Sequence, residues 1–101
     1  MKVFLDDCRS APEGWILVRH AMDAIAHLRN NSVTHLSLDH DLGDDIIETG
    51  YDVILWIEEA VAMKNFIPPE ITIHSSNPSA HRKMQLGINK IKQLAKKEFT
   101  I

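Results

Sequence analysis

The segment VTHLSLDHDLG (residues 33–43) decides how the rest of the sequence is interpreted. From about Val33 to Leu38 it is a short, largely apolar run, which is typical of a buried β-strand. The run stops at Asp39, where a loop rich in acids begins. The segment therefore predicts a buried strand that delivers polar groups at its carboxyl end.

Three further apolar runs in the sequence end in the same way. They span Lys2 to Leu5, Trp15 to Val18 and Ile71 to His74. The polar residues at their carboxyl ends are Asp6 and Asp7, Arg19 and His20, and His74 to Asn77. Short continuous runs bounded by polar loops indicate the strands of a buried parallel sheet.

Helices are expected after the second, third and fourth of these strands. Thr49 followed by Asp52 resembles a capping box, so a helix should begin near Gly50. Asn77 and Pro78 offer an N-cap and a first helical residue for the last helix. The expected apolar stripes are Met22, Ile25 and Leu28; Val53, Ile54, Ile57 and Val61; and Met84, Ile88, Ile91 and Ala95.

Strands that alternate with amphipathic helices predict an α/β fold with a parallel sheet covered on both faces. A length of 101 residues with 45% hydrophobic content supports one core, so residues 1–101 are expected to form a single domain. The first two strands are separated by too few residues for the usual crossover helix. One helix of the ordinary doubly wound pattern is therefore missing.

The formal net charge of -3 argues against strong non-specific binding of nucleic acid. The single cysteine, Cys8, cannot form an internal disulfide and fits a reducing compartment. The sequence carries no pattern of a signal peptide and no apolar run long enough to span a bilayer. We therefore expect a cytoplasmic protein without a membrane partner.

The carboxyl ends of parallel strands meet at one edge of a sheet, so the polar groups after the four strands should converge there. Crowded carboxylates are relieved by a hard divalent cation, and we predict Mg²⁺ or Mn²⁺ at this edge. The candidate metal ligands are Asp6, Asp7 and Asp39. The candidate catalytic residues are His40, His74 and Asp41, with the histidines in proton transfer. The candidate substrate-binding residues are Arg9, Ser75 and Asn77.

Two structural explanations compete with these assignments. Acids commonly end strands as ordinary solvated groups, which applies to Asp6 and Asp7. A histidine at a strand end also often holds a structural hydrogen bond to a loop, which applies to His40 and His74. The sequence alone leaves both explanations open.

Four segments together resemble the family called the cyclic-phosphate processing receiver domain. They are Asp6-Asp7-Cys8-Arg9, Leu38-Asp39-His40-Asp41-Leu42-Gly43, Thr49-Gly50-Tyr51-Asp52 and His74-Ser75-Ser76-Asn77-Pro78. The resemblance implies a degenerate response-regulator receiver, a reduced receiver/flavodoxin-like three-layer sandwich. Its four-stranded parallel sheet has the order 2-1-3-4, with about three helices. Ala80 stands where the resemblance would place glycine.

The resemblance also implies a function. The first hypothesis is metal-assisted hydrolysis of a cyclic phosphate or related phosphoester, on RNA ends or nucleotides. The alternative is a non-enzymatic module that binds or senses a phosphorylated ligand. A third hypothesis is receiver-type phosphotransfer onto Asp39. In each case the expected partner is a phosphorylated small molecule or an RNA end.

Overall fold

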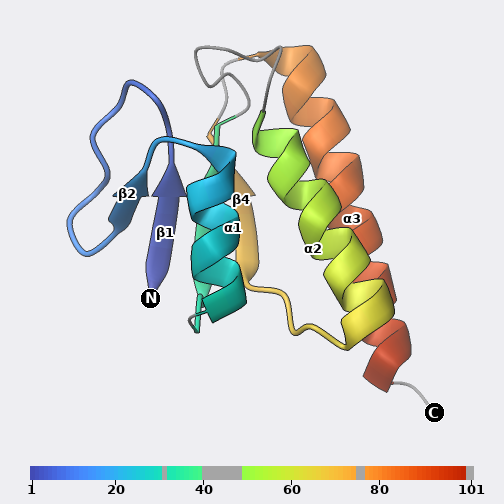
Figure 1. The fold of residues 1–101 in the computed structure, drawn as a ribbon. Helices are drawn as coiled ribbons and strands as arrows, with labels where there is room; N and C mark the ends of the chain where they lie inside the picture. The colour runs from blue at the N-terminus through green and yellow to red at the C-terminus, as the bar shows by residue number, and fades with distance from the viewer. Residues whose placement is uncertain (31, 40–48, 75–76, 100–101) are drawn as a thin grey trace.

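The computed structural model describes residues 1–30, 32–39, 49–74 and 77–99. These residues form a parallel sheet with helices packed against it (Figure 1). The strands are β1 (Lys2–Leu5), β2 (Ile16–Val18), β3 (His35–Leu38) and β4 (Glu70–Ile73). The helices are α1 (Ala21–Asn30), α2 (Gly50–Lys64) and α3 (Pro78–Phe99).

The strand order is β2-β1-β3-β4, and every neighbouring pair is parallel. The predicted sheet order and the number of helices in a receiver/flavodoxin-like α/β fold are therefore confirmed. Ser37 of β3 lies in register with Phe4 on one side and Thr72 on the other. This register places Phe4, Ser37 and Thr72 side by side on neighbouring strands, next to the functional site described below.

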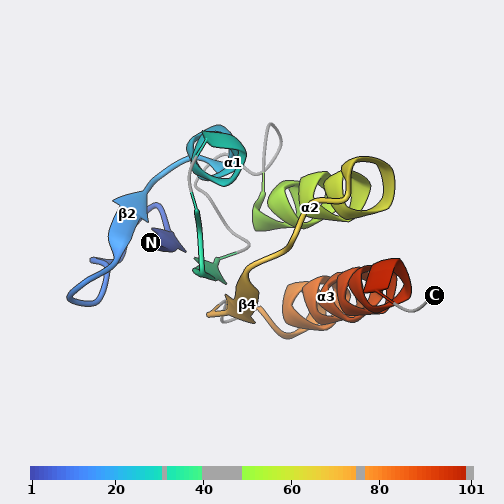
Figure 2. The same cartoon turned by 90° about the horizontal axis from the view of Figure 1, so that it is seen from below.

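The layering differs from the expected three-layer sandwich. In the described part of the chain, α1, α2 and α3 all lie on the same side of the sheet, and α3 packs on α2 beside β4 (Figure 2). The connections from β2 to β3 and from β3 to β4 cross the sheet in the same direction, so right-handed crossovers place their helices on one face. Only the connection from β1 to β2 runs the other way, and residues 6–15 of that connection form no helix.

The hydrophobic core lies between the sheet and the helices. Val3 and Leu5 of β1 and Leu36 and Leu38 of β3 point into it and are completely buried. The expected stripes of α2 and α3 are confirmed for Val53, Ile54, Ile57, Val61, Met84, Ile88 and Ile91. The stripe of α1 differs at Met22, whose side chain is 65% exposed. Its buried residues are Ala21, Ala24, Ile25 and Leu28, because the helix begins at Ala21 and this phase turns Met22 outward.

The opposite face of the sheet has a different composition. Alternate residues of a strand point to opposite faces, so Phe4 and Ser37 lie there and are buried, while Glu70 and Thr72 are exposed. The ring of Trp15, from the end of the β1–β2 connection, meets the edge of Phe4 at a centroid distance of 6.2 Å. This face is aromatic and polar where the helix-covered face is aliphatic.

Both predicted caps are confirmed. The Thr49 side chain accepts a hydrogen bond from the N–H of Tyr51, and the Thr49 N–H donates to Oδ2 of Asp52 over 2.8 Å. The N–H of Ala80 donates to Oδ1 of Asn77 over 3.1 Å at the start of α3. Both helices therefore begin at the carboxyl edge of the sheet.

The start of α2 passes so close to β3 that only glycine fits. A Cβ atom on Gly50 would overlap the backbone carbonyl oxygen of Asp39. The contact holds the first turn of α2 beside Asp39, and this is where the N–H groups at the helix start would favour an anion.

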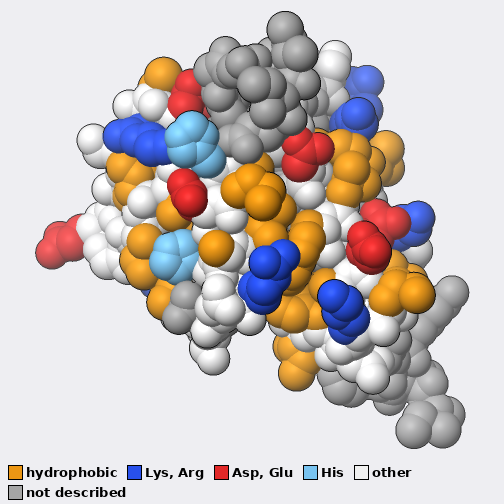
Figure 3. Space-filling model, viewed as in Figure 1, with side chains coloured by type: hydrophobic (Ala, Val, Ile, Leu, Met, Phe, Trp, Pro, Cys, Tyr) orange, Lys and Arg blue, Asp and Glu red, His pale blue; other side chains and the backbone are white. Residues whose placement is uncertain are grey.

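The surface over the helices mixes apolar, acidic and basic side chains (Figure 3). Within the part of the chain that the structure describes, every helix is too short or too polar to cross a lipid bilayer.

Candidate functional site

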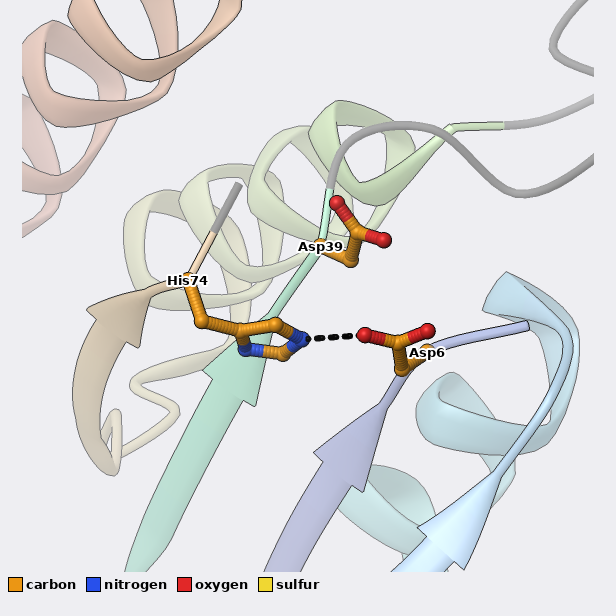
Figure 4. A group of neighbouring side chains, drawn as sticks. All are labelled: Asp6, Asp39 and His74. Carbon is orange, nitrogen blue, oxygen red and sulfur yellow. Dashed lines mark hydrogen bonds and ion pairs between the residues drawn. The ribbon is translucent and has the colours of Figure 1, made fainter. Parts of the chain in front are cut away.

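Three side chains from the ends of neighbouring strands come together at the carboxyl edge of the sheet. Asp6 follows β1, Asp39 follows β3 and His74 follows β4, and one possible ligand atom from each lies within 4.8 Å of the other two. Figure 4 shows the His74 ring and the Asp6 carboxylate directed at each other, with Asp39 beside them. Strands that are adjacent in space but distant in sequence therefore build one cluster.

Backbone hydrogen bonds place these three residues. The N–H of Asp39 donates to the carbonyl oxygen of Leu5 over 3.0 Å, and the N–H of His74 donates to that of Leu38 over 2.9 Å. The N–H of Asp6 donates to the carbonyl oxygen of Val18 over 3.1 Å. Each residue thus continues the ladder one step beyond its strand, so its side-chain position is set by the sheet.

Asp6 is the most buried acid of the described residues, with 1% of its surface exposed. Its Oδ1 accepts hydrogen bonds from the N–H groups of Cys8 (2.8 Å) and Arg9 (2.9 Å), and its Oδ2 lies 3.1 Å from Nε2 of His74. Burial alone would raise the pKa of Asp6. The hydrogen bonds from Arg9 and Cys8, then from His74, outweigh burial and lower the pKa. Asp6 is therefore ionised near neutral pH.

The ring of His74 is held on two sides. It stacks on Phe4 with a centroid distance of 4.2 Å and an interplanar angle of 5°, and its Nδ1 lies 2.7 Å from Oγ of Ser37. Burial lowers the pKa of His74 more than the nearby charges of Asp39 and Asp6 raise it. The neutral ring is the form that can act as a metal ligand or accept a proton.

Two arginines tie the β1–β2 connection to this edge. Nη1 of Arg9 donates to the carbonyl oxygen of His74 over 2.9 Å, and its side chain remains 55% exposed. Nη1 of Arg19 donates to the carbonyl oxygens of Asp6 and Arg9, each over 3.2 Å. Sequence reasoning singled out Arg9 but gave Arg19 no role, although Arg19 directly follows a strand.

The other site residues predicted from the sequence do not join this cluster in the described part of the chain. Asp7 lies outside the cluster, and its carboxylate accepts from the Cys8 thiol and raises the pKa of that thiol. Asn77 caps α3 with its side-chain oxygen. His40, Asp41 and Ser75 lie outside the described residues. Their catalytic and binding roles stay predictions.

Ser37 and Phe4 were missed by sequence reasoning, which treated the strands as continuous apolar runs. The signal for Ser37 was a single polar residue between Leu36 and Leu38. In a strand with two buried faces, such a residue requires a hydrogen-bond partner, and here the partner is His74.

The model of one protein family, the cyclic-phosphate processing receiver domain, matches residues 1–90. The chain belongs to this family. Its name associates the fold with the processing of cyclic phosphates through a receiver domain. No curated protein and no solved structure matches the chain significantly.

The cluster of this receiver domain fits a divalent cation. Ligand atoms about 2.1 Å from one octahedral ion lie about 3.0 Å apart when adjacent and about 4.2 Å apart when opposite. The three candidate atoms lie within 4.8 Å of one another, which is close to these separations. Asp6, Asp39 and His74 would hold the ion. Two carboxylates with one imidazole suit Mn²⁺ or Zn²⁺ better than Mg²⁺, which prefers oxygen ligands alone.

Proposed function

We propose that this receiver domain hydrolyses a cyclic phosphodiester, with a divalent cation held by Asp6, Asp39 and His74. The observation that carries the proposal is the meeting of these three ligand-type side chains at the sheet edge where α2 and α3 begin. A bound cation would supply charge neutralisation for the phosphate oxygens.

The chain's own groups would bind the phosphate. The guanidinium group of Arg9 is half exposed at the same edge, and its positive charge would attract a phosphate oxygen. The first turn of α2 lies against Asp39, where the positive end of a helix dipole favours an anion. Together these features support an anionic substrate next to the carboxylate cluster.

Proton transfer would fall to a residue other than a histidine that binds the cation. If His74 uses the lone pair of Nε2 as a ligand, it cannot also accept a proton there. His40 and Asp41 are the sequence candidates for that role, because they directly follow Asp39.

To test this, the protein is incubated with 2′,3′-cyclic nucleotides, or with RNA that ends in a 2′,3′-cyclic phosphate, in the presence of Mn²⁺, Mg²⁺ or a chelator. Chromatography then measures the product. We expect turnover with a cation, and loss of more than about 100-fold in Asp39→Asn, since even outer partners of metal ligands contribute roughly 10–100-fold. Asp23→Asn, on α1, is the matched control and should keep full activity. Equal activity with chelator and with cation would refute the metal-dependent mechanism.

A second function is a module that binds a phosphorylated ligand without turnover. One observation favours it: both oxygens of Asp6 already have protein donors, so no ion is needed to offset the burial of this carboxylate. Calorimetric binding of an intact 2′,3′-cyclic nucleotide, with no product after long incubation, would select this function over hydrolysis.

A further inference from the structure

Ser37 stands out because it is a buried polar side chain in the middle of a strand. Of the described residues, only Asp6 and Ser37 are both polar and buried, and Ser37 is 7% exposed. Its Oγ lies 2.7 Å from Nδ1 of His74. Ser37 therefore touches a residue of the cluster without being a candidate ligand itself.

The position of Ser37 follows from the sheet register. Phe4, Ser37 and Thr72 are neighbours across β1, β3 and β4, on the face away from the helices. The His74 ring folds onto this row, where it stacks on Phe4 and reaches Ser37 with Nδ1. The opposite ring nitrogen, Nε2, is thereby directed at Asp6 (Figure 4).

The hydroxyl of Ser37 can serve both tautomers of His74. An ionised carboxylate only accepts hydrogen bonds, so in the neutral, metal-free ring Nε2–H would donate to Asp6 and the Ser37 hydroxyl would donate to Nδ1. A cation on Nε2 requires the lone pair there, and the ring proton must then sit on Nδ1. Rotation of the Ser37 hydroxyl turns its oxygen into the acceptor for that proton.

We propose that Ser37 is a positioning residue that fixes His74 with Nε2 toward Asp6 and Asp39 and so makes the cluster favour imidazole-binding cations such as Mn²⁺ over Mg²⁺. This inference rests on the cation site of the proposed function. Metal-binding histidines regularly donate their other ring N–H to a protein acceptor, and loss of that acceptor weakens metal binding by roughly 10–100-fold. Without Ser37, the half-buried Nδ1–H would face a strand with no side-chain acceptor at that position.

The test is calorimetric titration of the wild-type protein and its Ser37 variants with Mn²⁺ and, separately, Mg²⁺. Ser37→Ala should weaken Mn²⁺ binding by roughly 10–100-fold and change Mg²⁺ binding by less than about twofold, because Mg²⁺ would use the carboxylates. Ser37→Thr retains the hydroxyl and should restore Mn²⁺ binding. Thr72→Ala removes an exposed hydroxyl from the registered neighbour and should change neither affinity.

The outcomes separate this inference from the proposed function. Wild-type protein that binds neither cation overturns the cation site and the role of Ser37 with it. Wild-type binding of Mn²⁺ that Ser37→Ala retains overturns only the role of Ser37. Equal losses of Mn²⁺ and Mg²⁺ binding in Ser37→Ala also overturn it, because a general disturbance of the strand would weaken both.

Two further measurements apply if Ser37→Ala does not fold. Ser37→Cys has nearly the same size but a weak hydrogen-bonding group, and it should show the same selective loss of Mn²⁺ affinity. Nitrogen NMR of the wild-type His74 ring should show a protonated Nε2 without metal and a protonated Nδ1 after addition of Zn²⁺. A ring that keeps its proton on Nε2 while Zn²⁺ is bound to the protein would overturn the inference.

Discussion

The same short strands form both faces of the sheet, but the side chains on the two faces have different roles. On the helix-covered face, Val3, Leu5, Leu36 and Leu38 are aliphatic and completely buried. On the other face, Phe4 and Ser37 hold the ring of His74. The comparison indicates that stability is concentrated on one face, whereas the other face orients the functional cluster.

The largest expected effect is a loss of stability on the helix-covered face. Leu36→Ala removes a fully buried side chain and should lower the free energy of unfolding by about 2–5 kcal/mol. Urea unfolding measures this change, and Met63→Ala at an exposed site should stay within about 0.5 kcal/mol. Cation binding by the folded fraction should be unchanged. A weaker cation affinity in folded Leu36→Ala would contradict the separation of the two faces.

A smaller loss of stability is expected at Asp6, together with a loss of cation binding. In Asp6→Asn, the hydrogen bonds with Cys8, Arg9 and His74 no longer involve a charged carboxylate, and hydrogen bonds to charged groups are the stronger ones, so we expect a loss of about 1–3 kcal/mol. Asp7→Asn changes the neighbouring carboxylate outside the cluster and should cost less than about 0.5 kcal/mol. Urea unfolding and Mn²⁺ titration of both variants would measure this. Equal losses of stability and of Mn²⁺ binding in Asp6→Asn and Asp7→Asn would show that the cluster does not distinguish Asp6 from Asp7, as we assign it.

Phe4→Leu sharpens the comparison because it keeps an apolar side chain but removes the stacked ring. We expect a loss of about 0.5–1.5 kcal/mol of stability beyond the change in buried area. Mn²⁺ affinity should fall as well, because His74 is less well held. Val3→Ile, on the other face of the same strand, is the control for Mn²⁺ affinity, which it should leave unchanged. A Phe4→Leu variant with wild-type Mn²⁺ affinity would show that stacking does not orient the ring.

The smallest expected effect is a dependence of stability on pH through one group. The pKa of His74 in the folded protein lies below its usual value of 6.5, so the unfolded chain binds the proton first as the pH falls. The contribution of His74 is therefore full above pH 6.5 and is lost as the pH falls toward the folded pKa. Burial lowers the pKa of His74 most and the charge of Arg9 adds to this, whereas the charges of Asp39 and Asp6 raise the pKa.

Denaturant titrations between pH 8 and pH 5 on the metal-free protein would measure this effect. In His74→Gln the part of the pH dependence that belongs to His74 should disappear. The contribution of Asp6, whose folded pKa is also lowered, belongs to more acidic conditions and should remain. Identical profiles of wild type and His74→Gln between pH 8 and pH 5 would contradict the assignment.

Much of the fold could be predicted because it depends on local patterns. Apolar runs ending in acids predicted the strands, and Thr49 with Asp52 predicted the start of α2 from a hydrogen-bonding pattern within one turn. The prediction for α1 was wrong at Met22, because periodicity alone does not show where a short helix begins. The expected cover on both sheet faces was also wrong, since handedness and the helix-free connection from β1 to β2 act only at the level of the whole sheet.

The amino-acid sequence by itself determined which residue types end each strand. It therefore also determined that acids and a histidine would meet at one edge of a parallel sheet. Only the tertiary structure decided which of them share a cluster: Asp6 and Asp39 meet His74, while Asp7 does not. The physical reason is that Asp6, Asp39 and His74 each continue the hydrogen-bond ladder one step beyond neighbouring strands, whereas the chain leaves the sheet in a bend at Asp7. The same register decided that Ser37 supports His74, a contact across strands that no local pattern encodes.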